Sequence, residues 1–182
     1  MAKVDWDRHS RFLVKFGPVG AARQLSFVVI LLFYMFQIDR PETSEQLEEY
    51  FELRWRILRA PWGRPRGSEK DEFDSKADHL TARDENGRLV AIGRLHLNSE
   101  AEAQIRYMAT AEAYRRLGAG RAIIEKLEEI AHSHGVECIM LNARNTVVGC
   151  YEHLGYSVVA PGPTMFGSIR HSRMEKSCRT VI

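Results

Sequence analysis

The sequence predicts a single α/β domain: a mixed, mostly antiparallel sheet of about six or seven strands with helices on both faces. Strand candidates in the first half are joined by hairpins. Those in the second half are separated by a helix long enough to cross over, and together these connections give a mixed sheet covered on both sides. A length of 182 residues fits one domain. The contents of 45% apolar and 27% charged residues are ordinary for a soluble globular chain.

The chain begins with an extension, residues 1–34, that is first basic and then apolar. Such a start suggests a signal peptide or a membrane anchor. However, the polar stretch Asp39-Arg40-Pro41-Glu42 stands where a cleavage site would be, and the apolar run of residues 25–38 is shorter than the about 20 residues of a spanning helix. We therefore expect residues 35–182 to form the domain, starting with a strand at Met35–Asp39. The extension is expected to pack as an extra helix or to be loosely held.

The first helix is predicted by its start and by the spacing of its apolar side chains. Thr43 or Ser44 can cap it by accepting hydrogen bonds from its first amides. Apolar residues then recur at helical spacing as far as Leu58, before Pro61 ends the helix. The segment from Arg64 to Asp74 is rich in Gly, Pro and charge, and is expected to be a solvated loop.

The remaining elements follow from turn signals and apolar runs. Asn86-Gly87 between apolar segments is a strong hairpin signal, and Gly135 is a natural helix stop. A continuous apolar run is typical of a strand buried on both faces. The expected elements are strands Asp78–Arg83, Leu89–Leu97 and Ala103–Ala109, a helix from Leu117 to His134, a strand Val136–Leu141, a short helix capped by Asn145, and closing strands Tyr156–Val159 and Ile169–Lys176.

The stretch from Gln104 to Arg121 combines a strand, a Gly-rich turn and the start of the long helix. The first amides of a helix have no internal partner, and the helix dipole makes that end positive. Gly118 and Gly120 allow close approach to the backbone, and Arg115, Arg116 and Arg121 add cations. Such a place suits a phosphate or pyrophosphate. The alternative is a Gly-containing turn with solvated arginines, and the spacing fits neither the dinucleotide fingerprint nor the nucleotide triphosphate loop.

Two signatures resemble one known family. Arg115-x-x-Gly118-x-Gly120 is similar to the Gln/Arg-x-x-Gly-x-Gly/Ala signature of the GNAT superfamily of N-acetyltransferases, and the segment Cys150 to Tyr156 resembles its second signature. The resemblance covers roughly residues 35–176. It implies the mixed sheet described above and acetyl-CoA as co-substrate. The departures are Glu112, where the family often has a nearby Pro, and Gly149 inside the short last helix.

The resemblance also assigns roles to residues. The cofactor's pantetheine arm would bind the backbone of Met108, Ala109 and Thr110, and Tyr151 would be the general acid that protonates the CoA thiolate. Either Asn142 or Asn145 would contact the cofactor, because the interval from Asn145 to Tyr151 is one residue shorter than in many relatives. The pyrophosphate would be held by Arg115, Arg116, Leu117, Gly118, Ala119, Gly120 and Arg121.

The expected function is direct transfer of the acetyl group of acetyl-CoA to a small-molecule or peptide amine. A catalytically inactive CoA-binding regulatory module is the alternative, and a membrane-tethered protein is a third interpretation. Without the second signature, Tyr151 would be expected only to pack between helix and sheet. Glu69, Asp71, Glu72, His96 and His171 are candidates for a general base, and none of them is assigned.

The acceptor is expected from the segment between Trp62 and Asp74, which borders the acceptor pocket in the resembling family. Its carboxylates would attract a cationic amine, and the nearby Trp55 could hold it by a cation–π contact of about 0.5–2 kcal/mol. This predicts a small primary amine or polyamine. The alternative is a solvated loop whose charges mostly cancel.

Charge and cysteine content limit the partners. A net charge of +2 gives no electrostatic case for nucleic acid or membrane binding. Three widely spaced cysteines show no metal spacing and no disulfide framework, so no metal is expected and the chain fits a reducing cytoplasm. A homodimer is left open.

Overall fold

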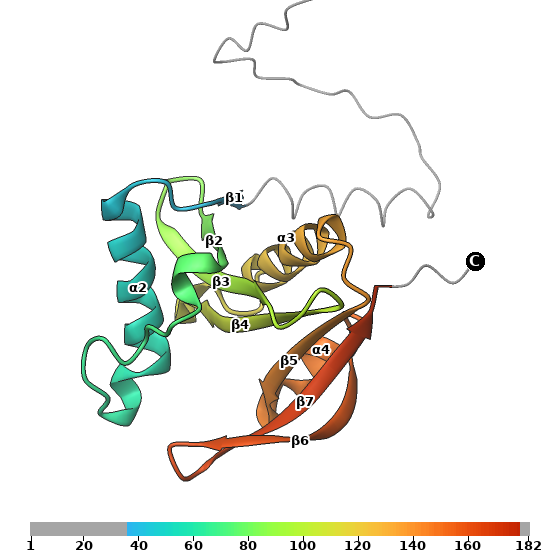
Figure 1. Cartoon of the computed structure of the whole chain (residues 1–182). Coiled ribbons are helices and arrows are strands. Elements are labelled where there is room, and N and C mark those ends of the chain that lie inside the picture. The colour runs from blue at the N-terminus through green and yellow to red at the C-terminus, as the bar shows by residue number, and fades with distance from the viewer. Residues whose placement is uncertain (1–35, 179–182) are drawn as a thin grey trace, which may run out of the picture.

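The computed structural model describes residues 36–178, which are built on one seven-stranded sheet in the order β1-β2-β3-β4-β5-β7-β6 (Figure 1). Within these residues β4 and β5 are the parallel neighbours, and every other neighbouring pair is antiparallel. The predicted mixed, mostly antiparallel sheet is therefore confirmed. The strands are β1 (Gln37–Asp39), β2 (Asp78–Arg83), β3 (Leu89–Leu97), β4 (Glu102–Thr110), β5 (Cys138–Arg144), β6 (Ser157–Met165) and β7 (Ile169–Ser177).

Helices cover both faces of the sheet, as the sequence predicts (Figure 1). Helix α3 (Ala119–Ser133) and helix α4 (Val148–Glu152) contribute to one core cluster, and helix α2 (Ser44–Leu58) forms a second cluster with Ile92 and Ala109. We call these the α3 face and the α2 face of the sheet. Short 3₁₀ turns connect the elements: η1 (Ala60–Trp62), η2 (Asp74–Lys76), η3 (Glu112–Tyr114) and η4 (Asn145–Val147).

Local signals explain where α2 and the first hairpin begin. The Thr43 side chain accepts a hydrogen bond from the Gln46 amide, and the Gln46 side chain accepts one from the Thr43 amide, which makes a capping box. In the β2–β3 turn the Gly87 amide donates to the Asp84 carbonyl, and Gly87 has φ +75°. Both predictions are confirmed, because each depends on neighbours within a few residues.

Several predicted boundaries are wrong. The strand expected at Val136–Leu141 is β5, which begins at Cys138 and continues to Arg144 because its last residues pair with β7. The long helix begins at Ala119 and not at Leu117, because Gly118 takes a left-handed conformation, with φ +96°, and acts as its N-cap. The strand expected to end at Val159 continues to Met165, since β6 is at the edge of the sheet, where prolines need not donate. Asn145 does not cap the last helix: Arg144 precedes η4, and Val147 precedes α4.

The predicted first strand is present as β1, although Met35 lies outside the described residues, as do residues 1–34. Phe36 is the first described residue, and its side chain is buried with 5% exposure. No helix among residues 36–178 is both long and apolar enough to cross a membrane.

Candidate functional site

The site is organised by a bulge in the middle of β4. Arg106 pairs with Arg94 of β3, but the next pair is Ala109 with Ile92, so β4 has one more residue than its partner between these pairs. Tyr107 lies in the bulge with φ +57°, a backbone conformation that residues other than Gly rarely adopt. A bulge bends its strand and redirects side chains. The bulge at Tyr107 is therefore placed to turn the end of β4 away from β5.

Beyond the bulge, β4 and β5 separate. Their pairing starts at Glu102 with Cys138 and ends at Ile105 with Leu141, while β4 stays paired with β3 to Thr110 and β5 stays paired with β7 to Arg144. The two strands thus enclose a wedge-shaped opening in the sheet. The backbone groups of β4 on this side, including those of Met108, Ala109 and Thr110, have no ladder partner in β5. An extended chain carrying amides can pair with such an edge.

The N-terminus of α3 lies beside this wedge. An added Cβ on Gly120 would be 3.2 Å from the Thr110 hydroxyl, so the helix start contacts the end of β4. The amides of Gly118, Ala119, Gly120 and Arg121 have no acceptor within residues 36–178, since Gly118 offers no side-chain cap and the first turn holds no acidic residue. The helix start therefore presents free N–H groups and the positive end of the dipole.

The three arginines predicted to bind a phosphate group surround this helix start. Arg121 donates to Glu125 at 2.7 Å, and Arg115 lies 3.9 Å from Glu112. Both side chains are more than half exposed, so these pairs are weak and leave the cations able to bind an anion. Arg116 is exposed and has φ +64°, which with Gly118 forms the turn that leads into α3.

Tyr151 lies on α4 and packs against the core cluster of the α3 face. Its ring makes an edge contact with Tyr156, with the ring centroids 6.0 Å apart. Burial, with a smaller effect of Cys150, raises the pKa of Tyr151 to about 12. The hydroxyl therefore keeps its proton at neutral pH, as a proton donor must. This packing is also what a purely structural role would give.

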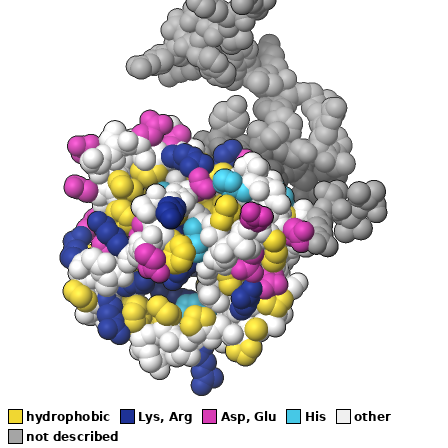
Figure 2. All heavy atoms as spheres, in the orientation of Figure 1, with side chains coloured by type: hydrophobic (Ala, Val, Ile, Leu, Met, Phe, Trp, Pro, Cys, Tyr) yellow, Lys and Arg dark blue, Asp and Glu magenta, His cyan; other side chains and the backbone are white. Residues whose placement is uncertain are grey.

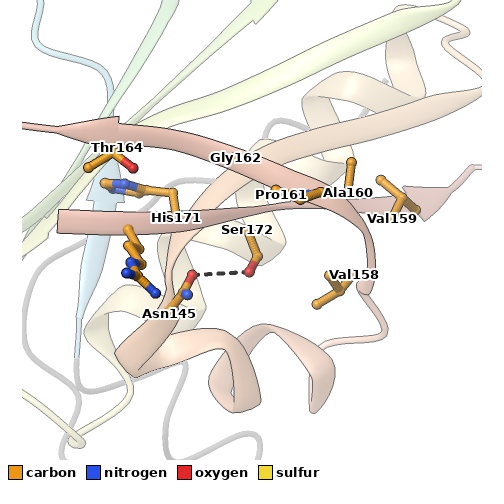
Figure 3. Close-up of a pocket in the computed structure, with 10 residues that line it drawn as sticks. Asn145, Val158, Val159, Ala160, Pro161, Gly162, Thr164, His171 and Ser172 are labelled. Atoms are coloured by element: carbon orange, nitrogen blue, oxygen red, sulfur yellow. Dashed lines mark hydrogen bonds between the residues drawn. The ribbon is translucent and has the colours of Figure 1, made fainter. Parts of the chain in front are cut away.

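The two asparagines predicted as alternatives occupy different places. The Asn145 amide oxygen accepts a hydrogen bond from the Ser172 hydroxyl at 3.1 Å, and both residues line an open pocket of about 520 Å³ under the β6–β7 hairpin, with His171 and Thr164 (Figure 3). Asn142 lies beside Gly162 of β6, where an added Cβ would be 3.1 Å from its amide oxygen. The choice between them stays a prediction.

The premise of a carboxylate-lined acceptor pocket is wrong for Asp71 and Asp74. Asp74 accepts a hydrogen bond from Arg54 at 2.8 Å, and Arg94 donates to both carboxylates. The Arg54 and Arg94 side chains have 0% exposure, so the two carboxylates neutralise buried cations. Glu69 is buried as well and accepts from the Gly67 amide.

The two histidines named as candidate bases are also engaged. Burial and the nearby Arg94 and Arg106 lower the pKa of His96 to about 4, so His96 is neutral at physiological pH. His96 is buried against Phe73 and faces Arg94. One ring nitrogen of His171 lies within hydrogen-bonding distance of the Pro163 and Ile169 carbonyls. No base is assigned from these contacts.

Sequence reasoning missed the arginine cluster around Tyr107. Arg54, Arg59, Arg94 and Arg106 each lie with the guanidinium carbon within 5.4 Å of its ring centroid, Arg54 at 3.2 Å. One signal was visible in the sequence: Arg54 falls on the apolar stripe of α2, where a charge demands a buried partner.

The fold and sequence match known proteins. The model of the "Acetyltransferase (GNAT) family" matches residues 47–156. A Bacillus subtilis (strain 168) protein with a provisional acetyltransferase name is 30% identical over 139 residues, covering 74% of this chain and 92% of that protein. A solved structure of a provisionally named N-acetyltransferase from Lactobacillus plantarum has a TM-score of 0.69 at 21% identity, covering 80% of this chain and 99% of the other. Aminoglycoside 6'-N-acetyltransferase complexed with coenzyme A gives a TM-score of 0.67 at 15% identity, covering 80% and 99%.

The seven-stranded mixed sheet with its open parallel pair, together with these matches, defines an α/β acyltransferase. More particularly, the chain belongs to the acetyltransferase (GNAT) family. Both the predicted resemblance and the predicted enzyme class are confirmed. Acetyl-CoA is accordingly the acetyl donor.

Proposed function

We propose that this protein transfers the acetyl group of acetyl-CoA directly to an amine, with the transfer taking place in the wedge between β4 and β5. The observation that carries this proposal is the uncapped N-terminus of α3 beside the wedge, with free amides from Gly118 to Arg121. A helix start of this kind binds phosphate groups well. In this position it would hold the cofactor's pyrophosphate, with Arg115 and Arg116 supplying charge.

The rest of the cofactor follows from this placement. From the helix start, the pantetheine arm would run along the free edge of β4, where the backbone groups of Met108, Ala109 and Thr110 could pair with its two amides. The thioester would then reach the widest part of the wedge. Asn142, the residue after the last β4–β5 pair, and Asn145, at the start of η4, are candidates for a further contact from the opposite wall.

Tyr151 is proposed to protonate the departing CoA thiolate. A tyrosine with a pKa of about 12 is a weaker acid than an ordinary thiol near about 8.5, so complete transfer to a free thiolate would cost about 5 kcal/mol. The proton would therefore move as the C–S bond breaks, in a transition state where charge is only partly developed on sulfur. Positioned acids of this kind contribute about 10²–10⁴ in rate.

The acceptor amine must attack in its neutral form. An amine with a pKa near about 10.4 would be neutral in about one molecule in 2,500 at pH 7, a cost of roughly 4.6 kcal/mol. A less basic amine, a desolvating pocket or a chain of water molecules could reduce this cost. The contacts of Glu69 and Asp71, and the lowered pKa of His96, favour these routes over direct proton abstraction by these three residues.

Binding of acetyl-CoA to a Gly120→Glu variant tests the cofactor site. The new side chain would meet the Thr110 hydroxyl and bring negative charge to the amides, so calorimetry should show no binding while circular dichroism shows an unchanged fold. Lys126→Glu, on the exposed side of the same helix, is the matched control and should bind normally. Undiminished binding by Gly120→Glu would refute the site.

Measuring turnover distinguishes an acetyltransferase from a catalytically inactive CoA-binding module. An enzyme releases CoA from acetyl-CoA faster when an amine is added, whereas a binding module holds acetyl-CoA without amine-stimulated release. A thiol reagent that reports free CoA measures both rates in one experiment.

A further inference from the structure

The arginines around Tyr107 are held in a fixed arrangement. Tyr107 donates its hydroxyl proton to Asp71 at 2.8 Å, and the Arg54 guanidinium lies 3.2 Å above its ring centroid. Arg94 donates to Asp71 and to Asp74, which also accepts from Arg54. The buried arginines and the strained bulge residue are thus part of one hydrogen-bonded network, and a ligand would meet a preformed surface.

Positive charge is in excess around the Tyr107 and Phe166 rings. Four arginines contact the Tyr107 ring, and Arg64 joins Arg59 over the Phe166 ring at 4.7 Å. Three carboxylates lie among them: Asp71, Asp74 and Glu69. Five cations against three anions leave a formal excess of two positive charges.

Arg54 and Arg94 keep buried guanidinium donors without an acceptor among the described residues. The unused donors of Arg106 and Arg59, in contrast, are not among these fully buried atoms. The Arg106 side chain is 34% exposed, and its ion pair with Asp71 is long at 3.4 Å. Arg59 donates from Nε to the Ser68 carbonyl and from Nη1 to the Leu58 carbonyl, which leaves Nη2 without an acceptor among residues 36–178. A planar guanidinium with free donors suits a carboxylate.

The cluster lies on the opposite side of the wedge from the α3 N-terminus. The bulge points Arg106 and Tyr107 to the α2 face, where Tyr107 meets Arg54 of α2. Met108 points to the α3 face, since an added Cβ on Gly93 would lie 2.6 Å from its sulfur and 2.5 Å from Ile123 of α3. A thioester entering the wedge from the α3 face would therefore face a molecule bound at the cluster.

Aromatic rings close the outer side of this place. Trp62, after α2, stacks on Phe166 of the β6–β7 hairpin with ring centroids 6.0 Å apart. The face shown in Figure 2 is hollowed near its centre, with Lys and Arg side chains gathered beside the hollow. The walls thus come from segments far apart in the sequence.

We propose that the acceptor amine carries a carboxylate, which binds Arg106 and Arg59 on the α2 face while the amine reaches into the wedge. This inference rests on the proposed function and names its substrate class: an amino acid or another amine with an anionic group. It replaces the polyamine expected from the sequence, because Asp71 and Asp74 of the loop neutralise buried arginines.

Matched acceptor pairs test this proposal in the full-length chain. CoA release is measured with glycine, phenylalanine and glutamate, and with the α-carboxamide of each. The amine of a carboxamide is less basic and so more often neutral, which means that chemistry alone favours the amide. We expect kcat/KM at least tenfold higher for the free carboxylate of at least one pair.

Substitutions of single arginines test which side chain binds the acceptor's carboxylate. Arg106→Gln should raise KM for the preferred carboxylate at least tenfold, lower the ratio of kcat/KM for the acid to that for the amide at least tenfold, and leave KM for acetyl-CoA unchanged. Arg106→Lys should restore part of the loss, since it keeps the charge and loses the fork. Arg56→Gln, on the exposed side of α2, is the control and should have no effect.

Each result bears on the proposal. Equal or better turnover of the amides, with acetyl-CoA bound, would overturn the anionic acceptor and leave the acetyltransferase proposal standing. If no acceptor is turned over, or if acetyl-CoA does not bind, calorimetry with N-acetylphenylalanine and N-acetylphenylalaninamide tests the anion site directly. At least tenfold tighter binding of the acid, lost in Arg106→Gln, supports the site. Equal binding of the acid and the amide refutes it. Failure to bind acetyl-CoA refutes the proposed function alone.

Discussion

Replacing Asp74 by Asn should destabilise the protein strongly, because Asp74 compensates two cations that have no access to water. Arg54 and Arg94 have 0% side-chain exposure, Asp74 has 11%, and Asp74 accepts hydrogen bonds from both. Breaking a buried pair by removing one partner costs about 3–5 kcal/mol, since a buried charge is left uncompensated. Asp71 still faces Arg94, and the Asn oxygen still accepts one bond. We therefore expect the lower end, about 3 kcal/mol.

Urea unfolding followed by circular dichroism measures this change. The midpoint should fall while the slope stays the same, as a pure stability change requires. For a chain of this size, a loss of about 3 kcal/mol lowers the melting temperature by roughly 6–12 °C. Glu72→Gln, an exposed carboxylate of the same loop, is the matched control and should change stability by less than about 0.5 kcal/mol.

A double variant tests the cause. Arg54→Met removes the cation that Asp74 binds, so Asp74→Asn should cost at least about 1 kcal/mol less in that background than in the wild type. Equal costs in the two backgrounds would show that Asp74 acts by another route. A loss below about 1 kcal/mol in the single variant would refute the claim that this carboxylate compensates the buried arginines.

The stabilisation by Asp74 should also depend on pH, because only the ionised carboxylate compensates the arginines. Burial alone would raise the pKa of Asp74, but hydrogen bonds from Arg54 and from the Asp71 amide hold it below its ordinary value. A carboxylate with a lowered folded pKa contributes stability above its unfolded pKa, about 3.9, and loses it as pH falls toward the folded pKa. The difference between wild type and Asp74→Asn should be constant from pH 8 to about 5 and shrink below about 4.

Three further predictions concern catalysis, packing and the domain boundary. Tyr151→Phe should lower kcat by about 10²–10⁴ with KM for acetyl-CoA unchanged, and CoA release at the wild-type rate would exclude the hydroxyl from catalysis. Gly93→Ala should lower the free energy of unfolding in urea by about 1–3 kcal/mol, since its Cβ would lie 2.5 Å from an Ile123 methyl. Gly149→Ala, in a helix with space around this residue, should instead raise it by about 0.5–1 kcal/mol. A chain beginning at Met35 keeps Phe36, which packs on Tyr114, and should bind acetyl-CoA like the full chain; an insoluble product would place the boundary earlier.

The elements that the sequence predicted well are those set by near neighbours. The capping box at Thr43 and the turn at Gly87 need partners only a few residues away, and the apolar run of β5 is readable because both of its faces are buried. The bulge at Tyr107 is different, since it exists only in the register of β4 against β3. No residue type marks it, because Tyr is an unusual residue at positive φ. The bulge and the wedge beyond it were therefore not predicted from the sequence.

The charge of the acceptor side shows why local counting fails there. Within residues 62–74 the acidic residues outnumber the basic ones, and this predicted a cationic acceptor. The partners of Asp71 and Asp74 lie on α2 and on β3, and the fold brings these arginines to the loop from both sides of it in the sequence. Each pairing removes a carboxylate from the pocket, whereas Arg106 on β4 keeps exposed donors. The sign of a pocket is thus set by the charges left after the buried pairs form, and here those charges favour an anion.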